Sequence, residues 1–174
     1  MRYICALTIA GSDCSGGAGI QADIKTMSAL GVYAATAITS ITVQNTKGVQ
    51  AVHGVSPLIV AEQIKTVMDD IKPDAVKIGM VNDCATIHAI ADTLKFYPNI
   101  PVVIDPIMIS TSGFRLIKQD ALELFCHSLL PISTLLTPNL PEAEILSNMK
   151  IYTIDDMDIA AQRILSLGCK AVLI

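Results

Sequence analysis

Residues 3–31 read YICALTIAGSDCSGGAGIQADIKTMSALG, and the order of elements in this stretch indicates the class of fold. Its first part, Tyr3–Gly11, is an apolar run of the kind found in a strand buried on both faces. Its last part carries apolar residues at the spacing of an amphipathic helix, namely Ile20, Ile24, Met27 and Leu30. Gly31 follows them and is a typical helix stop. The stretch therefore predicts a strand, a glycine-rich turn and a helix.

The same alternation of strand and helix continues along the rest of the chain. Further strands are predicted over Tyr33–Val43, Ala75–Gly79, Pro101–Asp105 and Thr134–Thr137, with an extended segment at Val49–Val55 and the start of a strand at Lys170–Ile174. Further helices are predicted from Pro57 onward, from Asp83 to about Phe96, and over Lys118–Leu130, Glu142–Ser147 and Asp155–Leu167. We therefore predict one three-layer α/β/α domain over residues 1–174, with a mostly parallel central sheet.

The composition limits the classes of function. Apolar residues make up 52% of the 174 residues and charged residues only 16%, which suits a sheet covered on both faces. The net charge is −4 and the basic residues are scattered, so the sequence argues against a nucleic-acid or membrane-surface partner. No apolar run approaches the about 18–20 residues of a transmembrane helix. The five cysteines are irregularly spaced, which favours reduced thiols in a cytoplasmic protein.

The glycine-rich turn permits more than one interpretation. Residues 17–22 fit the dinucleotide pattern G-x-G-x-x-G/A, but Val43-Gln-Asn45 stands at the end of the second strand, where that pattern needs an acidic residue. We therefore set a dinucleotide site aside. Either the turn brings the backbone close to another ligand, with unpaired N–H groups at the helix start, or it is a tight strand-to-helix turn that binds nothing.

Polar residues lie beyond the carboxyl ends of the predicted strands, where ligands bind in such folds. The side-chain amide of Gln44 matches the ring nitrogen and exocyclic amine of an aminopyrimidine, unless it bonds the backbone of the next turn. Asp23 is expected in the first helical turn, where a carboxylate also favours the helix dipole. Asp105 and Glu142 suit a hydrated Mg²⁺, which takes few protein ligands. The alternatives for these two acids are turn chemistry and a helix-start charge.

Five motifs occur together and in order along the chain. They are Ala6-Leu-Thr-Ile-Ala-Gly-Ser-Asp13, Ser15-Gly-Gly-Ala-Gly-Ile-Gln-Ala-Asp23, Val43-Gln-Asn-Thr46, Lys77-Ile-Gly-Met80 and Thr137-Pro-Asn-Leu-Pro-Glu142. This set resembles that of the bifunctional hydroxymethylpyrimidine and phosphomethylpyrimidine kinases of thiamine biosynthesis, in the ribokinase-like superfamily. Pyridoxal kinases share the opening motif and the Asn-x-x-Glu feature, and the Val-Gln-Asn-Thr stretch favours the pyrimidine enzyme.

The resemblance implies a role for each candidate residue. Gln44 would hydrogen-bond the aminopyrimidine with Asp23 close by, and the ring pocket would be lined by Gly11, Ala18, Met80 and Ile107, the last a position that is often Val in the family. Asn139 would meet the ATP phosphates, while Asp105 and Glu142 would organise Mg²⁺, usually through water. The resemblance also implies a homodimer and in-line transfer of the γ-phosphate of ATP to the hydroxymethyl group.

Two expected segments of the family pattern do not occur within residues 1–174. The family has a second glycine-rich segment that supplies the anion hole and the catalytic residue, and a Lys-Gly-Gly segment after the strand that starts at Lys170. We therefore expect the chain to be the N-terminal two-thirds of such a kinase, with its catalytic group beyond Ile174, and residues 1–174 alone to be inactive. Two other functions stay open, namely a pyridoxal kinase and a non-catalytic ligand-binding module.

Overall fold

The computed structural model describes residues 3–108, 117 and 119–174 and contains a six-stranded sheet in the order β3-β2-β1-β4-β5-β6. The strands are β1 (Cys5–Asp13), β2 (Tyr33–Asn45), β3 (Gly48–Gly54), β4 (Ala75–Ile78), β5 (Val102–Ile104) and β6 (Leu135–Leu136). Neighbouring strands are parallel except β2 and β3, which form an antiparallel hairpin. The prediction of a mostly parallel sheet is confirmed.

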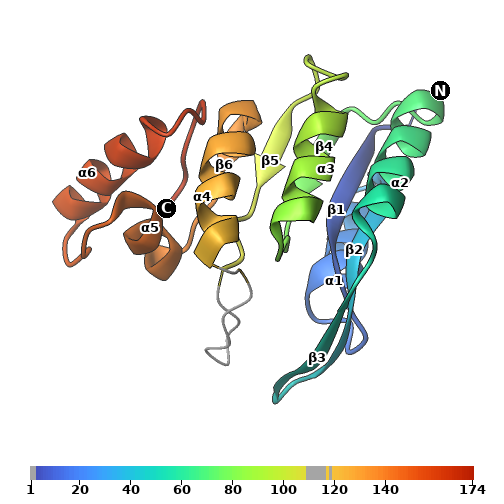
Figure 1. Cartoon of the computed structure of the whole chain (residues 1–174), viewed down its shortest axis with the longest axis horizontal. Coiled ribbons are helices and arrows are strands. Elements are labelled where there is room, and N and C mark those ends of the chain that lie inside the picture. Colours follow the sequence, from blue (N-terminus) through green and yellow to red (C-terminus); the bar gives the residue numbers. More distant parts are fainter. Residues whose placement is uncertain (1–2, 109–116, 118) are drawn as a thin grey trace.

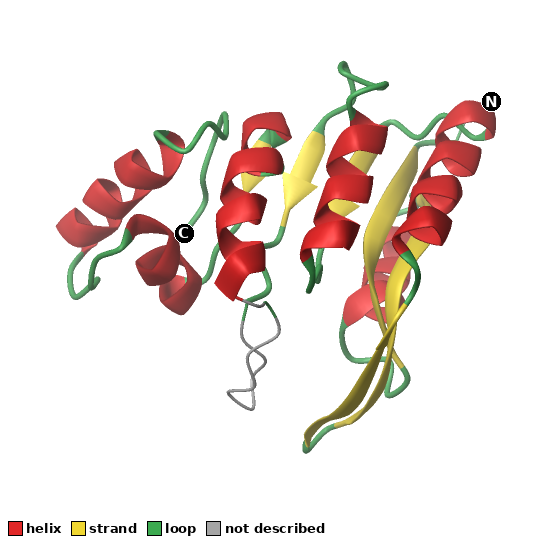
Figure 2. Cartoon of the chain, viewed as in Figure 1, coloured by secondary structure: helices red, strands yellow, loops and turns green. Residues whose placement is uncertain are grey.

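Helices cover both faces of this sheet (Figure 1). They are α1 (Gly19–Ala29), α2 (Pro57–Asp70), α3 (Cys84–Leu94), α4 (Gln119–Ser128), α5 (Leu140–Ser147) and α6 (Ile154–Leu165). Figure 2 shows α2, α3 and α4 side by side on one face, with α1 behind the strands. The strand order explains this arrangement. The chain passes from β1 to β2 in one direction along the sheet, and later through β4, β5 and β6 in the other direction. Because both kinds of crossover are right-handed, their helices lie on opposite faces. The three-layer fold is confirmed.

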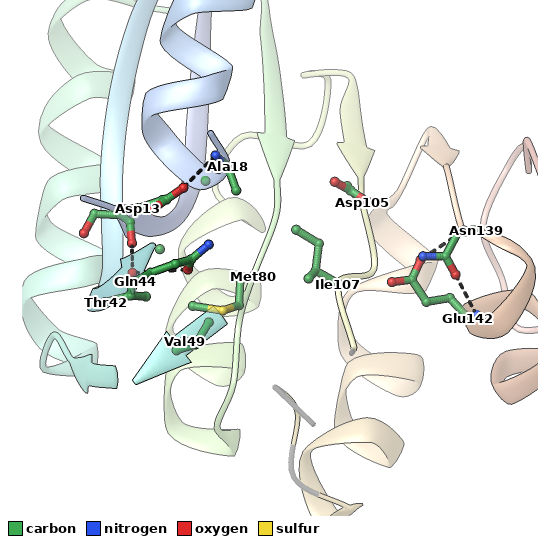
Figure 3. A pocket seen from close by; sticks show the side chains of 13 residues that line it. Asp13, Ala18, Thr42, Gln44, Val49, Met80, Asp105, Ile107, Asn139 and Glu142 are labelled. Carbon is green, nitrogen blue, oxygen red and sulfur yellow. Dashed lines mark hydrogen bonds between the residues drawn. The ribbon is translucent and has the colours of Figure 1, made fainter. Parts of the chain in front are cut away.

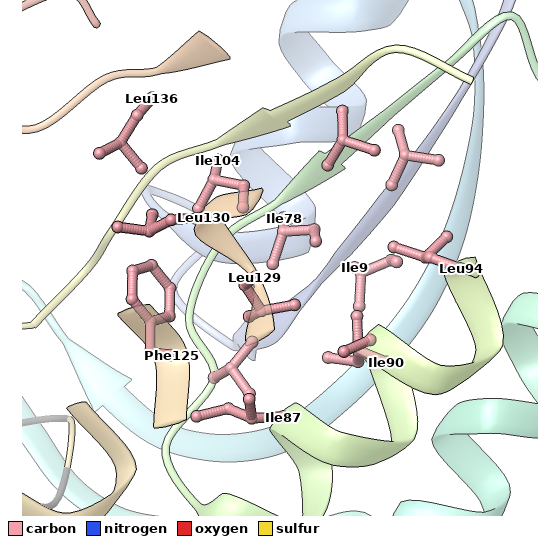
Figure 4. Packing of buried hydrophobic residues seen from close by; sticks show 14 of the residues in the cluster. Ile9, Ile78, Ile87, Ile90, Leu94, Ile104, Phe125, Leu129, Leu130 and Leu136 are labelled. Carbon is pink, nitrogen blue, oxygen red and sulfur yellow. The ribbon is translucent and has the colours of Figure 1, made fainter. Parts of the chain in front are cut away.

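The core lies between the sheet and the helices α2, α3 and α4, which cover one of its faces (Figure 4). Four neighbouring strands each contribute a side chain with no exposed surface: Ile9, Ile78, Ile104 and Leu136. They pack with Ile87 and Ile90 of α3 and with residues of α4. Burying each such side chain stabilises the fold by roughly 1.5–3 kcal/mol, so this layer holds the strand ends in place.

Most helix starts follow the expected cap chemistry. The Asp83 carboxylate accepts the backbone N–H of Thr86 at 2.9 Å, as predicted, and Ser56 caps α2 just before Pro57. The expected strand over Lys170–Ile174 is present only as one parallel bridge between Val172 and Leu136. Lys118, the expected first residue of α4, lies outside the described residues. In the part of the chain that the structure describes, no helix is long and apolar enough to cross a membrane.

Candidate functional site

A cavity of about 310 Å³ opens at the carboxyl ends of the parallel strands (Figure 3). Its lining residues are Gly11, Ser12, Asp13, Ala18, Gly19, Thr42, Gln44, Val49, Met80, Asp105, Ile107, Asn139 and Glu142. Every candidate residue from the sequence lies in this lining except Asp23. The volume suits a single small ring rather than an extended ligand.

The turn after β1 is organised around the carboxylate of Asp13, a residue that is only 2% exposed. This carboxylate accepts the backbone N–H groups of Ser15, Gly17 and Ala18 at 2.8, 3.0 and 2.8 Å and also the Ser15 hydroxyl. Burial by itself raises the pKa of Asp13, but these hydrogen bonds outweigh it and hold the pKa below 3.8. Asp13 therefore satisfies N–H groups of the turn that precedes α1, whereas among the described residues no side chain caps the start of α1 itself, in line with the expectation of unpaired N–H groups there.

Close packing forms the floor of the cavity on this side. A Cβ atom at Gly11 would lie 2.5 Å from Cε of Met80 and 2.7 Å from Oγ of Ser40, so any larger residue would require these side chains to move. Gly19 has a φ of 56°, a left-handed conformation that glycine adopts without strain. Met80 and Ile107 then present apolar surface to the cavity (Figure 3). Apolar walls of this kind suit the faces of a heterocyclic ring.

Gln44, near the end of β2, places its side-chain amide in the cavity (Figure 3). The amide oxygen accepts only a long bond, 3.4 Å, from the Thr42 hydroxyl, which also donates to the backbone oxygen of Ser12 at 2.7 Å. Cys14 holds the Gln44 backbone: its thiol donates to the Gln44 carbonyl at 3.0 Å and accepts the Gln44 N–H at 3.3 Å. The backbone is thus fixed, while most of the hydrogen-bonding capacity of the side-chain amide remains for a ligand.

The opposite wall carries two carboxylates with different surroundings. Glu142 is 3% exposed and forms a capping box with Asn139: each side chain accepts the backbone N–H of the other at 3.0 Å. Burial raises the pKa of Glu142, although the N–H groups of Asn139 and Met108 oppose the shift. Asp105 follows β5 with a side chain that is 40% exposed, and burial raises its pKa while Lys77 lowers it.

This wall suits a metal ion held through water better than one bound directly. The Glu142 carboxylate oxygens already accept N–H groups, whereas Asp105 is open to the cavity. Within the described residues, no group of three or more His, Cys, Asp or Glu side chains is arranged to hold a metal. The donor set therefore fits a hydrated Mg²⁺, which keeps several waters and needs one or two carboxylates.

Asp23 is not part of the cavity lining. Helix α1 begins at Gly19, so Asp23 is beyond the first turn and the expected interaction with the helix start is wrong. Its carboxylate instead accepts the Lys77 ammonium at 3.0 and 3.1 Å and the Thr8 hydroxyl at 2.6 Å. Asp23 thus belongs to a polar cluster with Lys77 and Thr8, outside the cavity lining.

Five further residues line the cavity: Ser12, Asp13 and Gly19 belong to the glycine-rich turn that the sequence marks as a candidate ligand site, whereas Thr42 and Val49 were not expected there. Asp13 carried a usable signal, since an Asp just before a glycine-rich turn is placed to accept the backbone N–H groups of that turn. Val49 carried none, because its place in the lining depends on the hairpin that folds β3 back along β2.

The fold and the cavity define a class, a three-layer α/β domain with a small-molecule site beyond the carboxyl ends of its parallel strands. Residues 13–174 match the family described as phosphomethylpyrimidine kinase. The chain belongs to this family.

Individual relatives agree with the assignment. The chain is 49% identical to a Rhizobium meliloti hydroxymethylpyrimidine/phosphomethylpyrimidine kinase, covering 97% of this chain and 64% of the relative. The chain thus spans less than two thirds of that relative's length. The crystal structure of a Clostridium difficile phosphomethylpyrimidine kinase superimposes with a TM-score of 0.92 at 50% identity, covering 98% of this chain and 74% of that one. An ADP complex of Bacillus subtilis pyridoxal kinase gives a TM-score of 0.86 at 39% identity, with 98% and 64% covered.

Proposed function

We propose that the protein carrying this chain phosphorylates 4-amino-5-hydroxymethyl-2-methylpyrimidine, and then its monophosphate, with ATP in thiamine biosynthesis. The observation that carries the proposal is a small cavity that combines the Gln44 amide with the apolar walls of Met80 and Ile107. The amide offers a donor and an acceptor side by side, which complements the ring nitrogen and amino group of the pyrimidine. Family membership supports the same reaction.

In this proposal each side of the cavity has a separate task. Gly11, Ala18, Met80 and Ile107 hold the pyrimidine ring, and Gln44 sets its orientation. Asp23, which the resemblance places close to the pyrimidine, pairs with Lys77 outside the cavity lining. Asn139 meets the phosphates of ATP.

Asp105 and Glu142 orient a hydrated Mg²⁺, which would offset the charge of the phosphates. The reaction needs little covalent chemistry from the protein, so these residues act by positioning and electrostatics.

A pyridoxal kinase is the second candidate, because the B. subtilis pyridoxal kinase shares the fold at 39% identity. A side-by-side turnover assay with Mg²⁺ and ATP separates the two. We expect a higher kcat/KM for the pyrimidine alcohol than for pyridoxal, and phosphate transfer to pyridoxal alone would contradict the proposal. Absence of transfer to either, with retained pyrimidine binding, would support a ligand-binding module.

We also propose that the protein is a cytoplasmic homodimer. The family resemblance supports the dimer, and the five free cysteines suit a reducing compartment. Light scattering of the purified protein tests the dimer, and fractionation of cells tests the location. A monomeric mass or a membrane-bound pool would contradict the corresponding part.

A further inference from the structure

Lys77 places a cation next to Asp105, a residue that lines the candidate site, although Lys77 itself is not part of the lining. It lies on β4 in register with Thr8 of the neighbouring strand β1. Its ammonium nitrogen is 3.0 and 3.1 Å from the two carboxylate oxygens of Asp23 and 3.9 Å from Oδ2 of Asp105. Lys77 thus joins a helix of one face to the wall of the cavity formed after β5.

The surroundings hold this ammonium group in one place. The Thr8 hydroxyl donates to Asp23 at 2.6 Å, which fixes the carboxylate that Lys77 contacts. A Cβ atom at Gly79 would lie 2.8 Å from the Lys77 nitrogen, so the glycine leaves the space that the lysine occupies. The Lys77 side chain is 20% exposed and that of Asp23 17%, so solvent screens the pair only in part.

The charges around the cavity bear on the role of this cation. Among the described residues, the lining contains the carboxylates of Asp13, Asp105 and Glu142 and no lysine, arginine or histidine. Backbone N–H groups satisfy Asp13, and the capping box satisfies Glu142. Among the described residues, no hydrogen bond satisfies the Asp105 carboxylate in this way, and the Lys77 ammonium lies 3.9 Å from its Oδ2 atom.

We propose that Lys77 is a positioning residue that, anchored by Asp23 and Thr8, holds the Asp105 carboxylate at the cavity rim and offsets its charge. This inference rests on the proposed function, in which Asp105 orients the metal-bound phosphates. A misplacement of about 1 Å at such a group can cost about 10²-fold in rate. Loss of Lys77 should therefore act on turnover through Asp105, not on recognition of the pyrimidine.

A double-mutant cycle in the full-length protein tests this inference. We expect Lys77→Met to lower kcat by roughly 10- to 100-fold. Lys77→Arg should recover most of that loss. In an Asp105→Asn background, Lys77→Met should change kcat by less than about threefold, because the group through which it acts is already lost. The matched control is Lys150→Met, which removes an exposed ion pair with Glu144 and should leave the kinetics unchanged.

Several outcomes would overturn the inference. Equal losses in both backgrounds would show that Lys77 acts independently of Asp105, and kinetics matching Lys150→Met would show no role. A crystal structure of Lys77→Met in which the Asp105 carboxylate keeps its position would overturn it without reference to activity. An inactive wild-type protein would instead contradict the proposed function, so the two failures are distinguishable.

Discussion

Gln44 is the residue on which recognition of the pyrimidine depends. Replacing it with Leu removes the amide at similar size, and we expect affinity for the pyrimidine alcohol to fall by roughly 10- to 100-fold, as for a lost hydrogen bond of about 1–3 kcal/mol. The melting temperature should change little, because the side chain is only partly buried. Calorimetric titration measures the affinity. Gln50→Leu, at an exposed position on β3, is the control, and equal affinities for both variants would contradict the assignment.

Cys14 gives a second way to disturb Gln44. It is the exposed member of the five cysteines, and its thiol makes both hydrogen bonds to the Gln44 backbone. Alkylation with iodoacetamide should break them and weaken pyrimidine binding, while bound ligand should slow the labelling. Cys14→Ser keeps a donor and an acceptor, so it should bind normally and resist the reagent. Unchanged binding by the alkylated wild-type protein would contradict this link.

The residues of the site differ in how far the sequence predicts them. Gln44, Met80 and Ile107 could be placed because each stands at or shortly after the end of a recognisable strand, and such strand ends meet at one edge of a parallel sheet. Asp23 was misplaced because an acid near a helix start has two possible partners, the helix dipole and a distant cation. Only the fold shows that Lys77, 54 residues away, is the partner.

The turn between β1 and α1 is an element whose stability depends on one charge. Replacing Asp13 with Asn puts an N–H₂ group among N–H donors, and we expect the free energy of unfolding at pH 7 to fall by about 2–4 kcal/mol. The folded-state pKa is lowered, so this contribution is full above the ordinary value of 3.8 and is lost as pH falls through the lower folded-state pKa.

Urea unfolding at pH 7 and in acid measures this difference. The gap between wild type and Asp13→Asn should narrow as the pH falls below 3.8. Asp92→Asn, which removes the exposed pair with Lys95, is the matched control and should have a much smaller effect. A gap that widens in acid would contradict the assignment of Asp13 as a buried anion.

Gly11 tests how closely β1 approaches the cavity floor. In Gly11→Ala the new methyl group meets Cε of Met80 and Oγ of Ser40, so the flexible Met80 side chain must move. We expect a loss of about 1–3 kcal/mol in stability from overpacking, together with weaker pyrimidine binding. Gly54→Ala serves as the control, because among the described residues a Cβ atom added at Gly54 would have no atom within 4 Å apart from its chain neighbours. A Gly11→Ala protein that binds as tightly as Gly54→Ala would contradict the packing described for the floor.

At the scale of elements, the sequence predicts the helices better than the strand ends. Periodic apolar residues and caps such as Ser56 and Asp83 define helices locally, so their positions follow from short stretches. The antiparallel direction of β3 follows locally, because only two residues connect it to β2. The single bridge at Val172 depends instead on pairing with the distant Leu136, for which there is no local signal.

The strand order places the site in the whole molecule. From β1, the chain adds β2 on one side and β4 on the other, so the crossover helices diverge at the carboxyl end of β1. The cavity lies there, with the glycine-rich turn on one side and the segments after β5 and β6 on the other (Figure 3). The sequence predicts the class of fold through its alternating elements, but this strand order emerges only from packing of the sheet.

Calorimetric titration of the purified protein with 4-amino-5-hydroxymethyl-2-methylpyrimidine and, separately, with pyridoxal tests whether the cavity recognises the pyrimidine. A pocket built from the Gln44 amide and the Met80 and Ile107 walls should bind one pyrimidine alcohol per chain, more tightly than pyridoxal, and Gln44→Leu should abolish that preference. Tighter binding of pyridoxal, or a pyrimidine affinity unaffected by Gln44→Leu, would contradict recognition of the pyrimidine alcohol through Gln44.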